Sequence, residues 1–285
     1  MDPVKYIDTI GELEDDDIDL AIAALGLATM ASRPMEYYLN HLQSLRTATS
    51  EYYSSLTGSL TGTDAIGSTN TANIHKQLHC LQAVVFGEFD YCGNQENYDE
   101  LENADLCAVI DRRKGMPIAL SILCIHIARS LGWDCAGIAM PGHFICRLQG
   151  SGERLVFDPF NKAKILEAPD LRQLVKQAMG PEAELKPEYY DVVSNSMILL
   201  RLQNNIKLRQ LQANHYEQAL DTLASMQKIS PEETGFLFER GQILARINQP
   251  MAAIDCLKQY IEKAPAHYDR SQATLLLQKL NKQLN

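Results

Sequence analysis

The chain has 285 residues, of which 46% are hydrophobic and 22% are charged, a balance typical of globular proteins. This length is enough for two domains, each with a core that needs neither disulfides nor metal ions. The net charge of -10, with no cluster of Lys and Arg, argues against nucleic-acid binding, because phosphate groups have to be neutralised by basic side chains.

The cysteines and the N-terminus indicate where the protein works. The seven cysteines are an odd number and form no C-x-x-C pair, so the sequence predicts neither a disulfide framework nor a zinc site. The acidic N-terminus differs from the basic and then apolar start of a signal peptide, and no apolar run reaches the roughly 18 residues of a membrane span. We therefore expect a cytoplasmic protein that contacts no membrane and binds no metal or cofactor.

Residues 1–53 are predicted to form N-terminal helices. Apolar residues recur at helical spacing over residues 17–49, and a break at Ser32, Arg33 and Pro34 separates two helices. The following residues, 54–73, are mostly Ser, Thr and Gly with few large apolar side chains to bury. We interpret them as a flexible loop.

Helical periodicity resumes at Ile74 and continues to Phe86, where GEFDYCGN supplies a turn. A second helix is expected to run to Arg113, and both Asn103 and Asp105 are candidate caps for its start.

The next helix begins with Pro117 in its first turn, where a missing N–H has no cost, and ends at Gly132. Its residues between 118 and 131 are apolar nearly all round, which predicts burial on most faces. His126 lies within this helix, and we interpret it as a core or edge histidine bonded to a backbone group rather than as a ligand.

Three short runs, CAGIAM, HFICRL and RLVFDPF, are rich in strand-forming residues and are separated by PG and GSGE turns. They predict antiparallel strands that follow helices, which indicates an α+β fold. From about residue 168 onward, the pattern is helical again.

The helical end of the chain contains an internal repeat. Four residues recur 34 positions later in one register: Ala219, Leu220, Leu223 and Pro231 correspond to Ala253, Ile254, Leu257 and Pro265. This is the period of tetratricopeptide helix hairpins. Two repeats are too few for an independent solenoid, so helices near 190–211 and after 268 are expected to cap them.

Two residues with catalytic potential lie at the ends of neighbouring strands. His143 follows Pro-Gly and is expected to begin a strand, and Asp158 ends the next, so a hairpin between them brings the side chains into hydrogen-bond contact. Such a contact orients the imidazole toward a neighbouring helix start. A structural interpretation stays open, because His143 also suits a PG turn and Asp-Pro commonly begins one.

The sequence resembles the bacterial SirB-type proteins, in which a transglutaminase-like core precedes tetratricopeptide repeats. The resemblance rests on RRKGMPI, PGHF and DPF and is close over residues 74–166. It implies an α+β, papain-like core over 74–167, after the N-terminal helices, and an all-α tetratricopeptide-like domain over 168–285.

The wider transglutaminase superfamily begins its catalytic helix with G-x-C. Laid on this chain, the pattern puts Pro117 at the nucleophile position, His143 at the catalytic His and Asp158 at the catalytic Asp. A proline cannot attack a carbonyl, and losing one triad member costs several orders of magnitude in rate. Of the other thiols, Cys146 is expected on the face opposite His143, Cys124 is expected to be buried, and Cys107 is left as a weak stand-in.

Two functions follow from these residues. The first is a non-catalytic scaffold or regulatory protein, a pseudo-enzyme that keeps His143 and Asp158 and binds a protein or peptide through its repeats. The second is a hydrolase or acyl transferase that uses Cys107 or water as the nucleophile, with His143 as base and Asp158 as its orienting partner. Pro117 favours the first.

Overall fold

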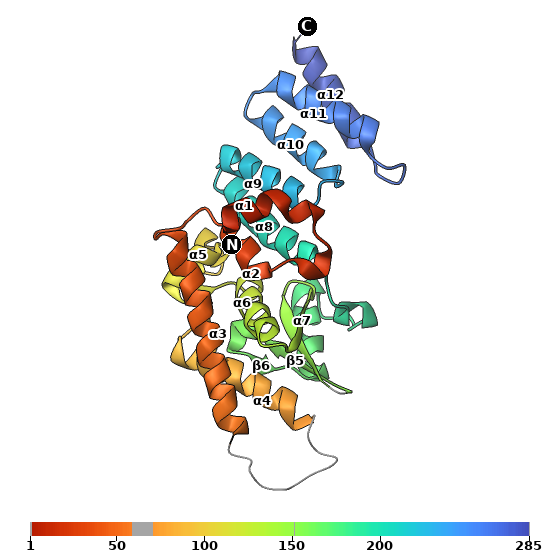
Figure 1. The fold of residues 1–285 in the computed structure, drawn as a ribbon. Helices are drawn as coiled ribbons and strands as arrows, with labels where there is room; N and C mark the ends of the chain where they lie inside the picture. The colour runs from red at the N-terminus through yellow and green to blue at the C-terminus, as the bar shows by residue number, and fades with distance from the viewer. Residues whose placement is uncertain (1, 59–70, 151, 285) are drawn as a thin grey trace. The chain divides into compact units, whose positions relative to one another are not determined.

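The computed structural model describes residues 2–58, 71–150 and 152–284. They form two compact units, and Figure 1 shows their elements. The first unit comprises Met1–Tyr6 and Leu13–Leu202, and the second comprises Ile7–Glu12 and Gln203–Asn285. Two helices, α1 (Pro3–Thr9) and α8 (Asn195–Gln212), contribute residues to both.

The first unit is mostly helical, with two small sheets. Its helices are α2 (Leu20–Gly26), α3 (Met35–Thr57), α4 (Thr71–Leu81), the π-helical turn η3 (Gln82–Glu88), α5 (Leu106–Arg112), α6 (Pro117–Ser130) and α7 (Ala168–Met179). Its short 3-10 turns are η2 (Asp15–Asp17), η4 (Leu101–Asn103), η5 (Pro159–Asn161) and η6 (Pro187–Tyr190). The expected 54–73 loop lies mostly outside the described residues, and its described ends belong to α3 and α4.

Local capping residues determine where α2 and α5 begin. The Asp19 carboxylate accepts hydrogen bonds from the backbone N–H groups of Ala21 and Ile22 at the start of α2. Of the two candidate caps for α5, the structure uses Asp105, which accepts from the backbone N–H of Ala108.

The larger sheet is antiparallel in the order β3-β4-β5-β6, formed by β3 (Asp134–Ile138), β4 (Ile145–Gly150), β5 (Glu153–Asp158) and β6 (Lys164–Ile165). Cys146 and Leu148 of β4 are buried opposite Phe157 and Leu155 of β5, and α4 and α6 pack against these two strands and β3. This side of the sheet holds the core of the unit, as the apolar sequence of α6 predicts.

Helix α7 packs against the sheet through a separate apolar cluster. Leu171 and Val175 of α7 are buried with Ile138 and Ile145 of the sheet. Farther along the chain, Val192 forms an antiparallel bridge with Ile138. For this reason residues 168–202 lie in the first unit, whereas the sequence pattern put the start of the helical domain at residue 168.

The second unit consists of helices. After the end of α8 come α9 (Tyr216–Ile229), α10 (Gly235–Arg246), α11 (Pro250–Lys263) and α12 (Ser271–Leu284), and the turn η1 (Ile10–Glu12) also belongs to it. Helix α11 repeats α9 with the 34-residue displacement of the sequence repeat, and sequential helices pack side by side (Figure 1). The equivalent Ala219 and Ala253 are both fully buried, and α8 and α12 stand where capping helices were expected.

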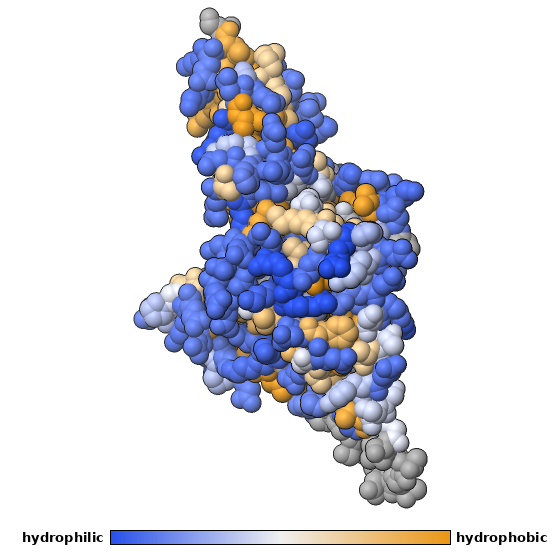
Figure 2. Space-filling view, turned by 90° about the vertical axis from the view of Figure 1, so that its left-hand side faces the viewer, coloured by the Kyte–Doolittle hydropathy of each residue, from blue (hydrophilic) through white to orange (hydrophobic). Residues whose placement is uncertain are grey.

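The exposed surface is mostly polar on one face of the molecule (Figure 2). On the face shown in Figure 2, hydrophilic residues predominate and hydrophobic residues form small groups. Within the described residues, the structure contains no helix that combines the length and the apolar character of a membrane span.

Candidate functional site

His143 lies in a tight turn just before β4. Its backbone N–H donates to the carbonyl of Met140 at 3.2 Å, and Gly142 has a φ of +68°. A Cβ at Gly142 would come within 2.8 Å of the Ala178 Cβ, so both the backbone and the space favour glycine. The expectation that His143 begins the strand was wrong, since β4 starts two residues later, after this turn has closed.

Asp158 ends β5 and is only 1% exposed. Its carboxylate accepts three hydrogen bonds: from His143 Nε2 at 2.9 Å, from Asn161 Nδ2 at 2.6 Å and from the backbone N–H of Phe160 at 2.9 Å. The predicted contact between His143 and Asp158 is therefore present. Asp158 bonds Nε2 of the imidazole, which leaves Nδ1 as the nitrogen for any other partner.

The strand register explains how the two side chains meet. Cys146 of β4 stands opposite Phe157 of β5 in an antiparallel pair, and the ladder extends to Gly150 opposite Glu153. The end of β5 at Asp158 therefore lies next to the start of β4 at Ile145, where the turn that holds His143 ends.

The start of α6 is linked to this pair through a short parallel ladder. Strands β1 (Cys92–Gly93) and β2 (Lys114–Gly115) pair side by side, with Gly93 opposite Gly115. Phe160 packs so closely on Gly93 that a Cβ there would lie 2.5 Å from its ring, and the same ring meets His143 edge-on at 6.0 Å.

Pro117 occupies the first position of α6, two residues beyond Gly115, and it is buried. The helix packs against η5, the turn that follows Asp158. The three positions that the superfamily pattern singles out thus belong to elements in contact, with a proline at the helix start.

The cysteines named as alternative nucleophiles are poorly suited to that role. Cys107, Cys124 and Cys146 are all fully buried. Burial raises the pKa of the Cys107 thiol to about 12, and the Asp105 and Asp111 carboxylates act in the same direction. Burial also raises the pKa of Cys124 and of Cys146 well above the usual value. A reactive cysteine needs an accessible thiolate with a lowered pKa, the opposite of these environments.

Three residues that the sequence analysis did not single out support the His143 turn. Asn161 donates to Asp158, and Phe160 lies between His143 and Gly93. Arg201 of α8 donates to the carbonyls of Met140 at 3.3 Å and of His143 at 3.2 Å. Asn161 follows DPF directly and was accessible to an Asx-turn argument, whereas the sequence carries no signal for Arg201.

A second His–Asp contact lies elsewhere in the first unit. His126 Nδ1 is 2.9 Å from Asp19 Oδ1, so the expectation that His126 bonds a backbone group was wrong. Asp19 is partly exposed. Burial acts to raise the pKa of its carboxyl, but hydrogen bonds from His126 and from the start of α2 outweigh burial and lower that pKa. This aspartate therefore serves as a helix cap that also fixes His126.

In the described part of the chain, no three His, Cys, Asp or Glu residues are arranged to hold a metal ion.

Comparison with known proteins relates this geometry to a family. Residues 37–204 match the transglutaminase-like superfamily, and residues 206–281 match the tetratricopeptide repeat. The chain is 30% identical to a UPF0162 protein of Vibrio cholerae over 63% of this chain and 67% of that protein. It is 29% identical to a UPF0162 protein of Xylella fastidiosa over 68% of this chain and 70% of that protein.

A third relative is Protein SirB1 of Salmonella typhimurium, which is 25% identical over 67% of this chain and 71% of that protein. Among solved structures, no match was found. The superfamily match covers more than half of the sequence and contains Pro117, His143 and Asp158. The chain therefore belongs to the transglutaminase-like superfamily, and tetratricopeptide repeats follow its transglutaminase-like region.

Proposed function

We propose that this protein is a non-catalytic scaffold or regulatory protein, in which a transglutaminase-like domain without a nucleophile accompanies repeats that bind a protein or peptide. One observation carries the proposal: the helix start where the superfamily has its thiol is Pro117, while His143 and Asp158 remain 2.9 Å apart. A histidine and a carboxylate can orient each other, but acyl transfer through a covalent intermediate needs a nucleophile.

The hydrogen bonds of Asp158 support a structural role for the pair. One carboxylate connects the His143 turn, the backbone of η5 and the Asn161 side chain. Such a buried and fully bonded group stabilises one conformation of the surrounding loops, whether or not chemistry occurs there. In this proposal the His143–Asp158 pair stabilises the conformation of the surface around α6.

The second candidate is a hydrolase that uses water as the nucleophile, with His143 as base and Asp158 as its orienting partner. The observation in its favour is the imidazole orientation, in which Nδ1 is not the nitrogen that bonds Asp158. Cys107 does not fit as the nucleophile of such an enzyme, because its thiol is buried and its pKa is raised.

We further propose that the protein acts in the cytoplasm of bacteria. Its seven cysteines are all free, which suits a reducing compartment, and the relatives named above are bacterial proteins.

The pH dependence of iodoacetamide alkylation, mapped by mass spectrometry, tests the loss of the nucleophile. We compare the wild type with Pro117→Cys and expect a fast, low-pH reaction only at the introduced thiol. The helix dipole and His143 should lower the pKa of that thiol below the roughly 8.5 of a free cysteine.

Two results would contradict the non-catalytic proposal. A fast reaction at Cys107 in the wild type, abolished by His143→Ala, would restore an enzyme with a displaced thiol. If Pro117→Cys folds but the pH dependence gives its new thiol a pKa no lower than that of a free cysteine, Pro117 does not occupy a nucleophile site beside His143, and the observation that carries the proposal is lost. Far-UV circular dichroism establishes that each variant is folded.

A further inference from the structure

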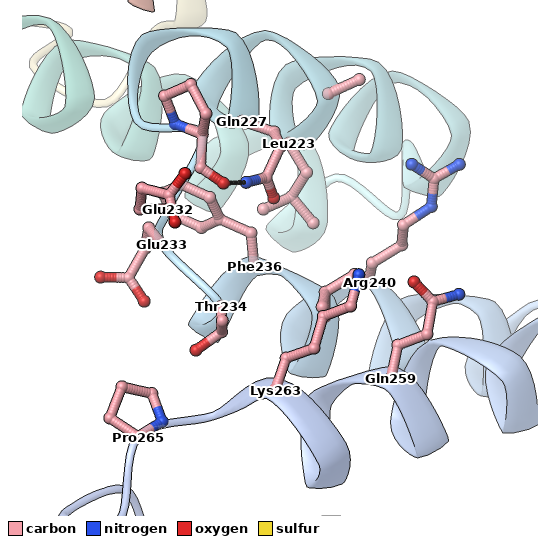
Figure 3. Close-up of a pocket in the computed structure, with 13 residues that line it drawn as sticks. Leu223, Gln227, Glu232, Glu233, Thr234, Phe236, Arg240, Gln259, Lys263 and Pro265 are labelled. Carbon is pink, nitrogen blue, oxygen red and sulfur yellow. Dashed lines mark hydrogen bonds between the residues drawn. The ribbon is translucent and has the colours of Figure 1, made fainter.

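The second unit contains a cavity of about 780 Å³ between α9, α10 and α11 (Figure 3). We call it the repeat groove and define it by Leu223 of α9, Thr234 just before α10, Phe236 and Arg240 of α10, and Gln259 and Lys263 of α11. Its volume is comparable to the roughly 300–1,000 Å³ of small-molecule sites, so it has room for a side chain of a ligand.

The centre of the repeat groove is apolar. Leu223 and Phe236 are 2% and 8% exposed, and Figure 3 shows both between the charged ends. Prolines at the ends of the two repeated segments, Pro231 and Pro265, add further apolar lining. This surface suits one apolar side chain of a ligand, because binding there removes the apolar area of that side chain from water.

The two ends of the repeat groove carry opposite charge. Glu232 and Glu233 lie at one end, and Arg240 and Lys263 lie toward the other (Figure 3). The Glu233 carboxylate already accepts the backbone N–H of Gly235 at 2.7 Å and the Tyr268 hydroxyl at 3.0 Å.

The basic end is better placed to bind a ligand than the acidic end. Arg240 and Lys263 are exposed, and within the described residues neither forms an ion pair with a carboxylate. Gln259 adds an amide beside them. Two neighbouring cations and an amide donor on a protein of net charge -10 form a local site for a carboxylate.

Thr234 gives a second, independent indication of a ligand. Its hydroxyl oxygen is buried and has no hydrogen-bond partner among the described residues, although the residue lines the groove. Buried polar groups are nearly always paired, so an unpaired hydroxyl on a residue that lines a cavity is suited to a group that enters the cavity. A hydroxyl both donates and accepts, as pairing with a peptide backbone requires.

We propose that the repeat groove binds an extended segment of a partner protein. The segment places an apolar side chain on Leu223 and Phe236 and a neighbouring Asp or Glu on Arg240 and Lys263. Its backbone pairs with Thr234. A peptide fits better than a small metabolite because the basic rim is exposed, whereas small-molecule sites enclose most of the ligand. This inference rests on the proposed function and narrows it to one surface and one ligand chemistry.

The test uses the full chain and a display library of random short peptides. We expect the wild type to enrich peptides in which an acidic residue neighbours a large apolar one. The double variant Arg240→Glu/Lys263→Glu should instead enrich peptides with a basic residue at the acidic position. Lys258→Glu is the matched control, since it reverses an exposed charge on the same helix α11 outside the groove, and it should leave the enriched pattern unchanged.

Fluorescence anisotropy with an enriched, labelled peptide then measures affinity. The double variant should weaken binding about tenfold or more, and Thr234→Val, which keeps the side-chain shape, about threefold to tenfold. Far-UV circular dichroism establishes that the variants are folded. Binding by the wild type should also weaken as salt is raised, since it depends on exposed charges.

Two outcomes overturn the inference and are distinguishable. If the wild type enriches peptides and the double variant binds them equally well, peptide binding stands but occurs outside the repeat groove. If the wild type enriches no peptide, the peptide ligand is wrong, together with the peptide-binding part of the proposed function. The alkylation experiment on Pro117→Cys tests the non-catalytic part independently of either result.

Discussion

The His143–Asp158 pair and the repeat groove satisfy their polar groups in different ways. Asp158 is 1% exposed and accepts three hydrogen bonds from its own unit. In the repeat groove, by contrast, Arg240 and Lys263 are exposed, and the Thr234 hydroxyl has no partner among the described residues. His143 and Asp158, which resemble a catalytic pair, are thus hydrogen-bonded to each other. The polar groups of the repeat groove, which resemble no catalytic site, are still able to bond a ligand.

Because of this difference, measurements of stability should report on the His143–Asp158 pair and measurements of binding on the repeat groove. Substitutions at the His143–Asp158 pair should change mainly the stability of the first unit, whereas those at the rim of the repeat groove should change mainly binding. Trp133, the one tryptophan of the chain, is buried in the first unit, so its fluorescence follows the unfolding of that unit.

The largest loss of stability is expected from Asp158→Ala. The substitution leaves His143 Nε2, Asn161 Nδ2 and the Phe160 N–H without their acceptor, and breaking a buried, hydrogen-bonded pair typically costs about 3–5 kcal/mol. Urea unfolding followed by Trp133 fluorescence should show this loss in the free energy of unfolding.

Asp134→Ala, which removes an exposed carboxylate from β3, is the matched control for Asp158→Ala and should stay within about 0.5 kcal/mol of the wild type. If Asp158→Ala were equally mild, the pair would contribute little to stability. Its geometry would then need a functional explanation, and the water-dependent hydrolase would become the better candidate.

The next largest effect is a pH dependence of stability that arises from the buried His41, which is hydrogen-bonded within the first unit. Its Nε2 lies 2.9 Å from the Tyr91 hydroxyl and 2.7 Å from Arg113 Nη1. Burial, assisted by the Arg113 charge and opposed by Asp111, lowers the pKa of His41 from 6.5 to about 4. Between these two values the unfolded chain binds a proton that the folded chain does not, so stability falls as the pH falls.

The loss should begin near pH 6.5, reach about 3 kcal/mol near pH 4 and not grow further below that value through this group. Urea unfolding of the first unit across this range measures it. His41→Gln should flatten the profile in this window, and His75→Gln, at an exposed histidine, should not. A wild-type slope that persists in His41→Gln would assign the effect to other groups.

In the second unit, substitution of the repeated alanines should destabilise the fold more than substitution at the rim of the repeat groove does. Ala219 and Ala253 are fully buried, and small side chains there allow neighbouring helices to approach closely. Ala219→Leu or Ala253→Leu should overpack the contact and destabilise the unit by about 1–3 kcal/mol.

Hydrogen exchange of peptides from α9 to α11, read by mass spectrometry, measures this change in the second unit. Ala224→Leu is the control, since it adds the same atoms at an exposed position of α9. Unchanged exchange in both buried variants would mean that the helices are not held together at these positions.

The sequence predicts what local pattern determines and misses what distant contacts determine. The helix that begins at Pro117, the 34-residue displacement of α9 and α11, and the hairpin that joins His143 to Asp158 all follow from periodicity, turns and register. The partner of His126 is 107 positions away in the chain, and nothing in its own helix identifies Asp19.

The same limit applies to the parts of the two sites that lie on other elements. Arg201 reaches the carbonyl of His143 across 58 positions, and no pattern near either residue predicts the contact. The repeat groove combines residues from α9, α10 and α11, so the repeat predicts the helices but not the charges that meet between them. Helix starts and hairpins are local, whereas sites assembled by packing are not.

The smallest change in stability is expected at Ser121, one turn after Pro117 on α6, and it is a gain rather than a loss. Its hydroxyl is buried and unpaired within the described residues, like that of Thr234, but it lies in the packed core and does not line the repeat groove. A buried hydroxyl without a partner has lost its bonds to water, so removing it should not cost stability, and alanine favours a helix more than serine does.

Ser121→Ala should therefore leave the free energy of unfolding unchanged or raise it by up to about 1 kcal/mol, measured by urea unfolding with Trp133 fluorescence. Ser121→Cys, which keeps a single γ atom of similar size but only a weak hydrogen-bonding group, controls for packing. A loss of more than about 1 kcal/mol in both variants would show that the Ser121 hydroxyl has a bonding partner, such as a buried water near the start of α6. In that case the core of the first unit would hold a water molecule beside Ser121, one turn after Pro117.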